Sequence, residues 1–294
     1  MNKRIHVVIN PASGQPDNIL NTINRVFHPA GIDWDISITK SSGDAVRFAQ
    51  EAVAAGADVV AAYGGDGTVM EVAQGVMGSQ VPLAILPGGT ANLMSVELGI
   101  PKKLVDAAQI ASSDTSTIRQ VDMGQVGERT FILRVEIGFG AEEIIQADRE
   151  LKDKYGRLAY VIAKVRASKT TQVAHYQITV DRRQYEVDGF ACFVDNSGTV
   201  GVPGVSMAPG TNASDGYFDV LVVRDKGLKS LYSMAASMAD KPTFREAYQH
   251  WQARSISIKA DPPQPVQADG ELLGETPISI GVLPGAMRVL VPSV

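Results

Sequence analysis

The sequence predicts two domains of different class, an α/β domain built on a parallel sheet and, after it, a β-rich domain. Strand-like and helix-like segments alternate over residues 1–120, as they do in βαβ units. From about Ile118 onward the apolar segments are mostly short and strand-like, and many are divided by Gly, Asn or Asp turns, which favours a sandwich or barrel. We therefore expect the second domain to cover residues 121–285.

The spacing of apolar residues indicates the elements of the first domain. Alternating or continuous apolar residues predict strands at Ile5–Ile9, Ile32–Ile38, Asp58–Tyr63 and Val81–Leu86. Apolar residues three or four apart predict helices over Ile19–Phe27, Val46–Val53, Val69–Met77 and Leu104–Ile110. Ser42 is suited to cap the second of these helices, and Gly56 to end it.

The second domain is expected to be mostly strands, with two helices between them. The strands are predicted at Phe131–Val135, Tyr176–Val180, Tyr185–Val187, Ala191–Val194, Tyr217–Val223, Ser255–Lys259 and Ile278–Val282. The helices are predicted at Leu158–Val165 and Leu228–Met238, where apolar residues recur at helical spacing.

The composition narrows the possible partners and the compartment. The chain has 294 residues and a net charge of -5, so it lacks the basic surplus with which proteins neutralise nucleic-acid phosphates. Its single cysteine, Cys192, lies in an apolar run and suits a reducing cytoplasm. No apolar run approaches the length of a membrane span, so a lipid substrate would have to be met from outside the bilayer.

The most informative motif is Gly-Gly-Asp-Gly-Thr at Gly64–Thr68, on a predicted strand-to-helix turn. Backbone N–H groups in such a turn can converge on a phosphate without side chains in the way. Asp66 is the only charge in the turn, and a carboxylate beside polyphosphate makes sense mainly with Mg²⁺ between them. The alternative is a tight turn that closes a βα unit, with Asp66 as a helix cap.

Three further turns follow predicted strands on the same edge of the sheet: Asn10–Gly14, Thr39–Gly43 and Pro87–Asn92. In an open parallel sheet, ligands bind outside the carboxyl ends of the strands. Each turn alone is ordinary turn chemistry, but four small, hydroxyl- and Gly-rich turns on one edge favour a nucleotide site. The chain has no GxxxxGK[ST] and no GxGxxG sequence, so neither common phosphate-binding fingerprint applies.

Two segments of the second domain are candidates for metal or proton chemistry. Asn212–Tyr217 reads either as a tight Asp-Gly hairpin turn or as a small cation site that uses Asp215 and nearby carbonyls. Asp269-Gly270-Glu271 also reads as a turn, but two carboxylates that flank a glycine could serve proton transfer and metal binding if the turn faces a cleft.

Together these motifs resemble the diacylglycerol kinase catalytic-domain family, which includes bacterial soluble lipid kinases and sphingosine kinases. The resemblance covers nearly the full length, in the family's order. It rests on Asn10-Pro11-x-Ser13-Gly14, Gly64–Thr68 with Glu71, Leu86–Asn92, Leu98–Pro101, Ser214–Gly216 and Asp269–Glu271. The motif Gly64–Thr68 alone is shared with NAD kinases and phosphofructokinase-like folds, whereas its combination with Leu86–Asn92 and Asp269–Glu271 is much more specific.

The resemblance implies an NAD kinase/phosphofructokinase-like α/β domain, followed by a β-sandwich domain, with the active site in the cleft between them. The strand Ala286–Pro292 would return to the first domain. It implies an ATP-dependent lipid kinase in which Glu271, alone or together with Asp269, activates the lipid hydroxyl, while Asp66 holds Mg²⁺. The implied nucleotide-binding residues are Asn10, Ser13, Gly14, Thr39, Gly64, Gly65, Asp66, Gly67, Thr68, Glu71, Gly89, Thr90 and Asn92, and the implied ligands of a structural Mg²⁺ are Asn212, Asp215 and Tyr217.

One position departs from the family pattern. Leu93, followed by Met94, stands after Asn92 where an acidic residue is common, and sphingosine kinases also lack that acid. We therefore expect a cytoplasmic protein that meets a membrane surface during turnover and phosphorylates a diacylglycerol-like or sphingoid lipid, with a homodimer left open. The alternatives are a kinase of a soluble substrate such as NAD, and a catalytically weak regulator that binds nucleotide or lipid.

Overall fold

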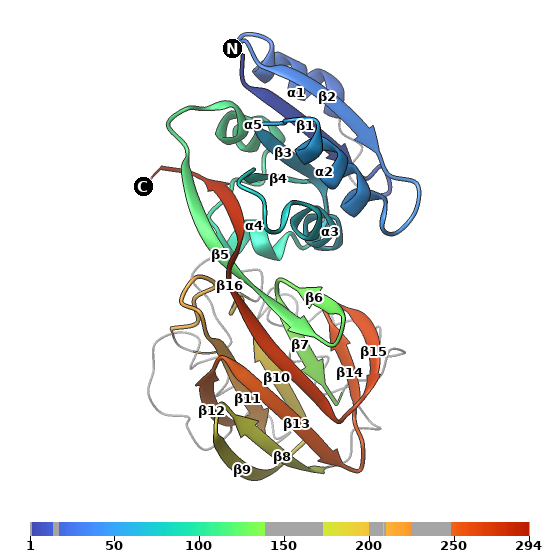
Figure 1. The fold of residues 1–294 in the computed structure, drawn as a ribbon, viewed down its shortest axis with the longest axis vertical. Coiled ribbons are helices and arrows are strands. Elements are labelled where there is room, and N and C mark those ends of the chain that lie inside the picture. The colour runs from blue at the N-terminus through green and yellow to red at the C-terminus, as the bar shows by residue number, and fades with distance from the viewer. Residues whose placement is uncertain are drawn as a thin grey trace, which may run out of the picture. The chain divides into compact units, whose positions relative to one another are not determined.

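The computed structural model describes residues 2–13, 18–138, 173–199, 208, 210–224 and 248–293. The chain divides into two compact units (Figure 1): unit 1 comprises Met1–Val121 with Gly285–Val294, and unit 2 comprises Asp122–Pro284.

Unit 1 is built on a parallel sheet. Its strands run in the order β2-β1-β3-β4, with β1 at Arg4–Ile9, β2 at Asp33–Ile38, β3 at Val59–Gly64 and β4 at Leu83–Pro87. The end of β16 (Ile278–Val291) adds a further parallel strand, because Val289 pairs with Leu83. All residues of β3 and β4 are buried, as expected of strands covered on both faces.

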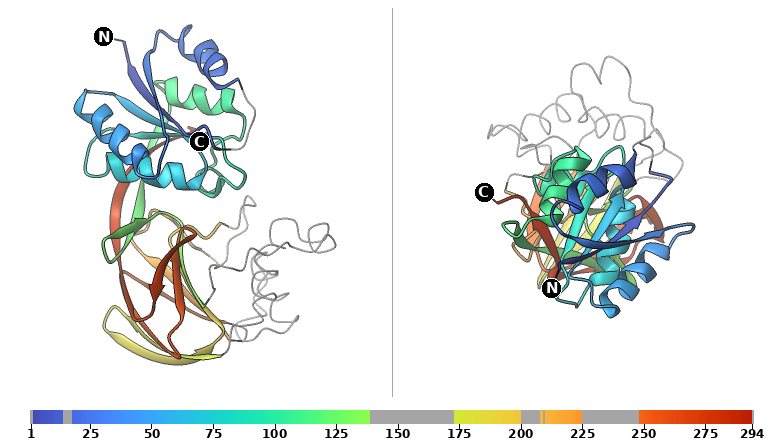
Figure 2. Two further views of the ribbon diagram at one scale, coloured as in Figure 1. Left: turned by 90° about the vertical axis from the view of Figure 1, so that its right-hand side faces the viewer. Right: turned by 90° about the horizontal axis from the view of Figure 1, so that it is seen from above.

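The helices of unit 1 cover the two faces of this sheet (Figure 2): α1 (Ile19–Phe27) packs with α5 (Leu104–Ser112), and α2 (Asp44–Ala54) packs with α3 (Asp66–Val76). The ring of Phe27 on α1 meets the ring of Trp34 on β2 edge to face, 5.9 Å between centroids. The short helix α4 (Leu93–Glu97) was not predicted, because five residues carry too few apolar positions to define a helical period.

The predicted cap of α2 was wrong. Gly43, not Ser42, is the N-cap residue, and its φ of +86° is in the left-handed region that glycine tolerates best. The Ser42 hydroxyl instead lies 3.4 Å from Glu71 Oε1. The backbone N–H groups at this helix end are satisfied by Glu71, a side chain of another helix, which local sequence does not reveal.

Unit 2 is an antiparallel β-sandwich. One layer has the strand order β16-β13-β8-β9, and the other has the order β12-β11-β10-β7-β14-β15. Their inward side chains form one apolar core, to which both layers contribute. The bounds are β5 Thr117–Val126, β6 Arg129–Phe131, β7 Arg134–Ile137, β8 Ala174–Val180, β9 Arg183–Gly189, β10 Ala191–Asp195, β11 Phe218–Val223, β12 Tyr248–Ala253, β13 Ser255–Asp261, β14 Pro265–Ala268 and β15 Glu271–Glu275.

Two differences from the predicted strands bear on the site. The single strand expected at Phe131–Val135 is divided between β6 and β7, because the intervening N–H groups of Ile132 and Leu133 donate to the side chain of Asp269. β12, β14 and β15 were not predicted, since polar residues interrupt their apolar pattern. The helices predicted at Leu158–Val165 and Leu228–Met238 lie outside the described residues.

Candidate active site

The four Gly- and hydroxyl-rich turns of unit 1 lie at one edge of its sheet. The strands β1, β2, β3 and β4 are mutually parallel, so their carboxyl ends share that edge. The turns begin at Asn10, Thr39, Gly64 and Pro87. Gly14, at the end of the first turn, lies outside the described residues.

The turn Gly64–Thr68 presents the start of α3 to this edge. Gly65 is the extended N-cap residue, and α3 begins at Asp66. The backbone N–H groups of Asp66, Gly67 and Thr68 have no acceptor among the residues that the structure describes. Unpaired N–H groups at a helix N-terminus, together with the helix dipole, attract a phosphate.

Close backbone packing explains the glycines of this turn and of the turn after β4. A Cβ on Gly64 would lie 2.4 Å from Thr68 Oγ1, and one on Gly89 would lie 2.5 Å from Gly65 Cα. The N–H of Gly88 donates to the carbonyl of Gly64, 2.9 Å away. Asn92, at a φ of +50°, brackets Gly89 by accepting from its N–H and donating to its carbonyl. The two turns therefore form one rigid backbone surface, beside which Thr90 is exposed.

Asn10 fastens the turn after β1 to the same surface. Its side-chain Nδ2 donates to Thr68 Oγ1 at 3.0 Å, and its Oδ1 accepts from the N–H of Ala12. The Ser13 hydroxyl donates to the carbonyl of Asn10 at 2.6 Å. Asn10 and Ser13 thus shape the turn through hydrogen bonds within the protein.

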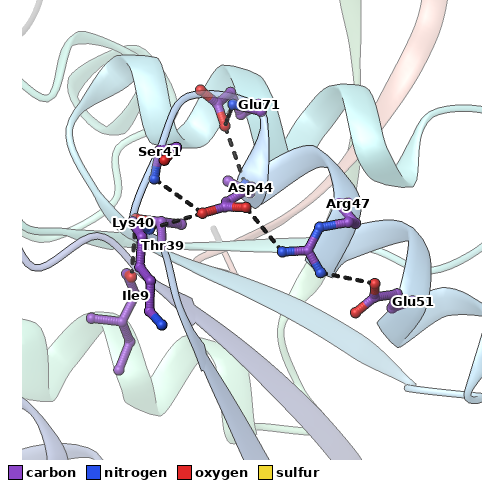
Figure 3. Close-up of polar contacts among 10 residues, drawn as sticks. Ile9, Thr39, Lys40, Ser41, Asp44, Arg47, Glu51 and Glu71 are labelled. Carbon is purple, nitrogen blue, oxygen red and sulfur yellow. Dashed lines mark hydrogen bonds and ion pairs between the residues drawn. The ribbon is translucent and has the colours of Figure 1, made fainter.

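Glu71 and Asp44 hold the turn after β2 (Figure 3). Glu71 Oε2 on α3 accepts from the N–H groups of Gly43 and Ala45, 3.1 and 3.2 Å away. Asp44 Oδ2 accepts from the N–H groups of Lys40 and Ser41, while the N–H of Thr39 donates to the carbonyl of Ile9. The Lys40 N–H bond, followed by the Arg47 side chain, holds the pKa of Asp44 below its usual range. Glu71 is a backbone acceptor here, and Asp44 is a residue that the sequence analysis missed.

Among the acidic side chains described at this edge, Asp66 keeps one carboxylate oxygen available to a cation. Its Oδ1 accepts from the N–H of Met94 at 3.1 Å, and its other carboxylate oxygen has no hydrogen-bond partner among the described residues. A half-buried carboxylate with one oxygen available fits Mg²⁺, which keeps several waters and takes one or two protein carboxylates together with substrate phosphates.

In unit 2, Asp269-Gly270 forms the hairpin turn between β14 and β15, with φ values of +48° and +88°. The Asp269 carboxylate is not free: it accepts from the N–H groups of Ile132, Leu133 and Arg134 at 2.7, 3.0 and 3.0 Å. Burial raises the pKa of Asp269 to about 6, against the lowering effect of these hydrogen bonds. Its geometry is that of a buried acceptor that orients the turn.

Glu271, two residues later, is an exposed carboxylate at the start of β15. Its Oε2 lies 2.8 Å from Arg129 Nη1, and both side chains are more than half exposed. Arg129 could not be recognised as its partner from local sequence, because the two residues are 142 positions apart in the chain. The candidate base Glu271 therefore forms an ion pair with the side chain of Arg129.

The segment Asn212–Tyr217 is a loop before β11, closed by its own side chains. Asn212 Oδ1 accepts from the Ser214 N–H, and Asp215 Oδ1 accepts from the Tyr217 N–H. The buried Asp122, which the sequence analysis also missed, accepts from the Gly216 N–H at 2.6 Å. The Tyr217 ring lies under the Arg254 guanidinium, 4.6 Å away.

The charges around this loop suit a divalent cation in part. Burial raises the pKa of Asp215, and the carboxylates of Asp219 and Asp122 add to that effect. Gathered carboxylates favour a cation. Among the residues that the structure describes, however, no three His, Cys, Asp or Glu side chains are placed to hold a metal, so carbonyls and water would have to complete the ligand set.

Comparison with known proteins agrees with this architecture. The diacylglycerol kinase catalytic domain matches residues 4–126, and the YegS C-terminal NAD kinase beta sandwich-like domain matches residues 134–291. The "Probable lipid kinase YegS" of Shigella dysenteriae serotype 1 is 30% identical over 283 residues, 94% of this chain and 92% of the relative. The "Probable lipid kinase YegS-like" of Klebsiella pneumoniae is 27% identical over 97% of this chain and 95% of the relative.

A solved structure agrees as well. The crystal structure described as a "putative diacylglycerol kinase" from Bacillus anthracis strain Sterne superimposes with a TM-score of 0.84, at 29% identity over 98% of this chain and 97% of that one. The fold and these matches define a kinase with an α/β unit and a sandwich unit. More particularly, the chain belongs to the diacylglycerol kinase catalytic-domain family, among its YegS-like lipid kinases, and kinases of this family use ATP.

Proposed function

We propose that this protein transfers the γ-phosphoryl group of ATP to the hydroxyl of a diacylglycerol-like or sphingoid lipid. The observation that carries the proposal is the start of α3, where three backbone N–H groups and one oxygen of Asp66 lack partners among the described residues. Phosphoryl transfer needs positioning and charge stabilisation more than covalent chemistry, and this turn would supply both.

The nucleotide is assigned to unit 1. The backbone N–H groups of Gly65–Thr68 would receive phosphate oxygens, and the turns that begin at Asn10, Thr39 and Pro87 would shape the rest of the site. Bound Mg²⁺ would neutralise charge on the β- and γ-phosphates. Asp66 would hold that ion, directly or through water.

Activation of the lipid hydroxyl is assigned to unit 2. Glu271 would take the hydroxyl proton as the oxygen attacks the γ-phosphorus. A bond then forms from the lipid oxygen to phosphorus, the bond from phosphorus to the bridging β,γ-oxygen breaks, and ADP leaves. Asp269 would act by orienting the turn, since its carboxylate is engaged with three N–H groups.

Asn212, Asp215 and Tyr217 are proposed as a structural Mg²⁺ site. The Asp215 carboxylate would provide charge, and Tyr217 would contribute through its backbone carbonyl, since its ring packs on Arg254. Such an ion would stabilise the loop without entering the reaction.

The preference for a lipid is supported by the family and by one residue. Leu93 is partly exposed at the start of α4, where an apolar side chain suits an apolar substrate end. The next residue, Met94, is fully buried, so its side chain is not available to a substrate in the same way. We propose residues 1–120 with 286–292 as the nucleotide domain and 121–285 as the lipid domain.

The protein would meet its substrate at a membrane surface, from the cytoplasmic side. Among the described residues, no helix is long and apolar enough to cross a bilayer. Whether the working form is a homodimer stays a prediction.

The experiment that tests the function is incubation with γ-labelled ATP, Mg²⁺ and mixed micelles of a fractionated lipid extract. The proposal expects label in the organic phase, dependent on Asp66.

A further inference from the structure

We propose that Asn196 is a positioning residue for the turn Asp269–Glu271. The proposal rests on the function proposed above for that turn, and it names a residue outside the motifs. Asn196 follows β10 directly and is fully buried. Its contacts show how it acts on the turn.

The turn is fastened to one short segment, Ile132–Arg134, which follows β6 and ends at the first residue of β7. All three N–H groups of that segment donate to the Asp269 carboxylate, and the Asp269 N–H donates back to the Arg134 carbonyl at 3.0 Å. The position of the turn, and with it the start of β15 at Glu271, therefore follows the position of this segment.

Asn196 holds the carbonyls of the same segment. Its side-chain Nδ2 donates to the carbonyl of Ile132 at 2.9 Å, and its backbone N–H donates to the carbonyl of Leu133, also at 2.9 Å. Asp269 thus binds the N–H groups of the segment while Asn196 binds its carbonyls.

The second hydrogen of the Asn196 amide reaches a different strand. Nδ2 also donates to the carbonyl of Asp122 on β5, 2.7 Å away. A single buried amide therefore joins β5 to the segment that carries Asp269. Only Asn has a donor pair at this reach, since Asp accepts and does not donate, and Ala and Ser are too short to reproduce both bonds.

The side chain of Arg134, the last residue of this segment and the first of β7, supports the arrangement. Its Nη2 donates to the carbonyls of Ser197 and Thr199 at 3.2 and 2.7 Å, and its Nε lies 3.1 Å from Asp195 Oδ1. The chain on both sides of Asn196 is therefore fixed to the segment that Asn196 itself binds. Asn196 is therefore one of several residues whose hydrogen bonds together fix the position of Ile132–Arg134.

The test compares Asn196→Ala with Gln264→Ala. Gln264 is also buried, and its Nε2 donates to two carbonyls, those of Pro262 and Pro263. It precedes β14, so it lies at the opposite end of the β14–β15 hairpin from Asp269. Each substitution removes two hydrogen bonds to carbonyls, but only Asn196→Ala is expected to loosen the turn Asp269–Glu271. Asn196→Ser serves in place of the alanine variant if the latter does not fold.

The first measurement is amide hydrogen exchange of the free protein at Ile132, Leu133 and Arg134. Asn196→Ala should speed exchange at these amides about tenfold or more, beyond any change in Gln264→Ala, because local opening becomes easier. Asp269→Asn should expose the same amides. Equal exchange in the two alanine variants would overturn the proposal, whether or not the protein proves to be a lipid kinase.

The second measurement is the split between kcat and KM. Asn196→Ala should lower kcat about tenfold or more and leave the KM for ATP unchanged, because the nucleotide is assigned to unit 1. Combined with Asp269→Asn, its effect on kcat should be much less than additive, since both residues act through one segment. Additive effects, or a kcat equal to that of Gln264→Ala, would overturn the positioning role. A wild-type protein that phosphorylates no lipid refutes the proposed function instead, and the exchange result still decides whether Asn196 holds the turn.

Discussion

The backbone N–H of Met94 donates a hydrogen bond of 3.1 Å to Oδ1 of Asp66, across 28 positions of the chain. This bond joins the start of α4 to the start of α3, and so ties the turn after β4 to the turn after β3. The bond occupies only Oδ1 of the Asp66 carboxylate. The other oxygen, Oδ2, stays available for the Mg²⁺ that we propose Asp66 holds.

Asp66→Asn separates these two roles. The amide oxygen of Asn can still accept the Met94 N–H, while the negative charge is lost. We expect a large fall in kcat and a weaker dependence on Mg²⁺, with an unchanged circular dichroism spectrum. The control is Asp58→Asn, just before β3, since Asp58 also accepts a backbone N–H, that of Arg4 at 2.7 Å. Activity near that of the wild type in Asp66→Asn would show that Asp66 serves only as the acceptor for the Met94 N–H.

Glu271→Gln tests the proposed base. Removal of a general base typically slows the chemical step by roughly 10²–10⁴-fold, and ATP affinity should change little. Single-turnover kinetics and ATP titration measure the two effects. Glu275→Gln, at the other end of β15, is the matched control. If Asp269→Asn abolishes turnover in a fully folded protein while Glu271→Gln does not, the two roles are exchanged.

Asp215→Ala tests the proposed structural cation. An ion that binds only the folded state stabilises it by mass action, so Mg²⁺ should raise the Tm of the wild type. The variant should have a lower Tm and should lose most of that Mg²⁺ response. Asp181→Ala is a suitable control, because Asp181 likewise accepts backbone N–H groups at a turn, those of Arg254 and Ser255. The same Mg²⁺ response in both variants would make the loop Asn212–Tyr217 an ordinary turn.

The buried Asp195 predicts how stability depends on pH. Burial raises its pKa to about 7, against Arg134, while Asp219 and Glu136 raise it further and His250 lowers it. In the unfolded chain this carboxyl has a pKa of about 3.9, so between pH 4 and 7 the folded state holds a proton that the unfolded state has released. The free energy of unfolding should therefore fall as pH rises through this range, by up to about 1.4 kcal/mol per pH unit from this group.

Urea unfolding of the wild type and Asp195→Asn at pH 5, 6, 7 and 8 measures this contribution. The variant should lose part of the slope between pH 5 and 7, while above pH 7 the two slopes should agree. Asp269, whose burial raises its pKa to about 6, contributes in the same direction and remains in both proteins. Parallel curves over the whole range would show that Asp195 is ionised in the folded protein.

Leu93→Asp tests the residue that departs from the family pattern. We expect a changed ratio of kcat/KM between a diacylglycerol and a sphingoid base in mixed micelles, with ATP binding retained. Val105→Asp places the same charge on an exposed apolar position of α5, and it should leave the ratio unchanged. An unaltered ratio in Leu93→Asp would remove this residue from the specificity of the enzyme.

Local sequence was sufficient for the features that depend on neighbouring residues. The run of apolar residues before Gly64 and the helical spacing after Thr68 predict a strand, a turn and a helix, which are β3, the turn and α3. Because β1 to β4 are parallel, the four turns share one edge, as expected. The Asp269-Gly270 hairpin was predictable for the same reason, since Asp-Gly favours the positive φ values of a tight turn.

The contacts that set the candidate site are long-range, and no local pattern reveals them. Asp269 binds Leu133 across 136 positions, and this divides a strand that apolar spacing presents as continuous. Asn196 follows the fully buried strand β10, and nothing in its neighbourhood marks it as a donor to two other segments. Glu71 caps a helix that precedes its own, so Ser42 was the natural but wrong choice from local sequence.

The choice of phosphoryl acceptor tests the central claim most directly. The protein is incubated with γ-labelled ATP and Mg²⁺ in parallel with lipid alcohols in mixed micelles, with NAD and with fructose 6-phosphate, and Asp66→Asn is assayed beside it. We predict label on a lipid that partitions into the organic phase, none on NAD or fructose 6-phosphate, and little product from Asp66→Asn. Label that stays in the aqueous phase, with NAD as the best acceptor, would contradict it.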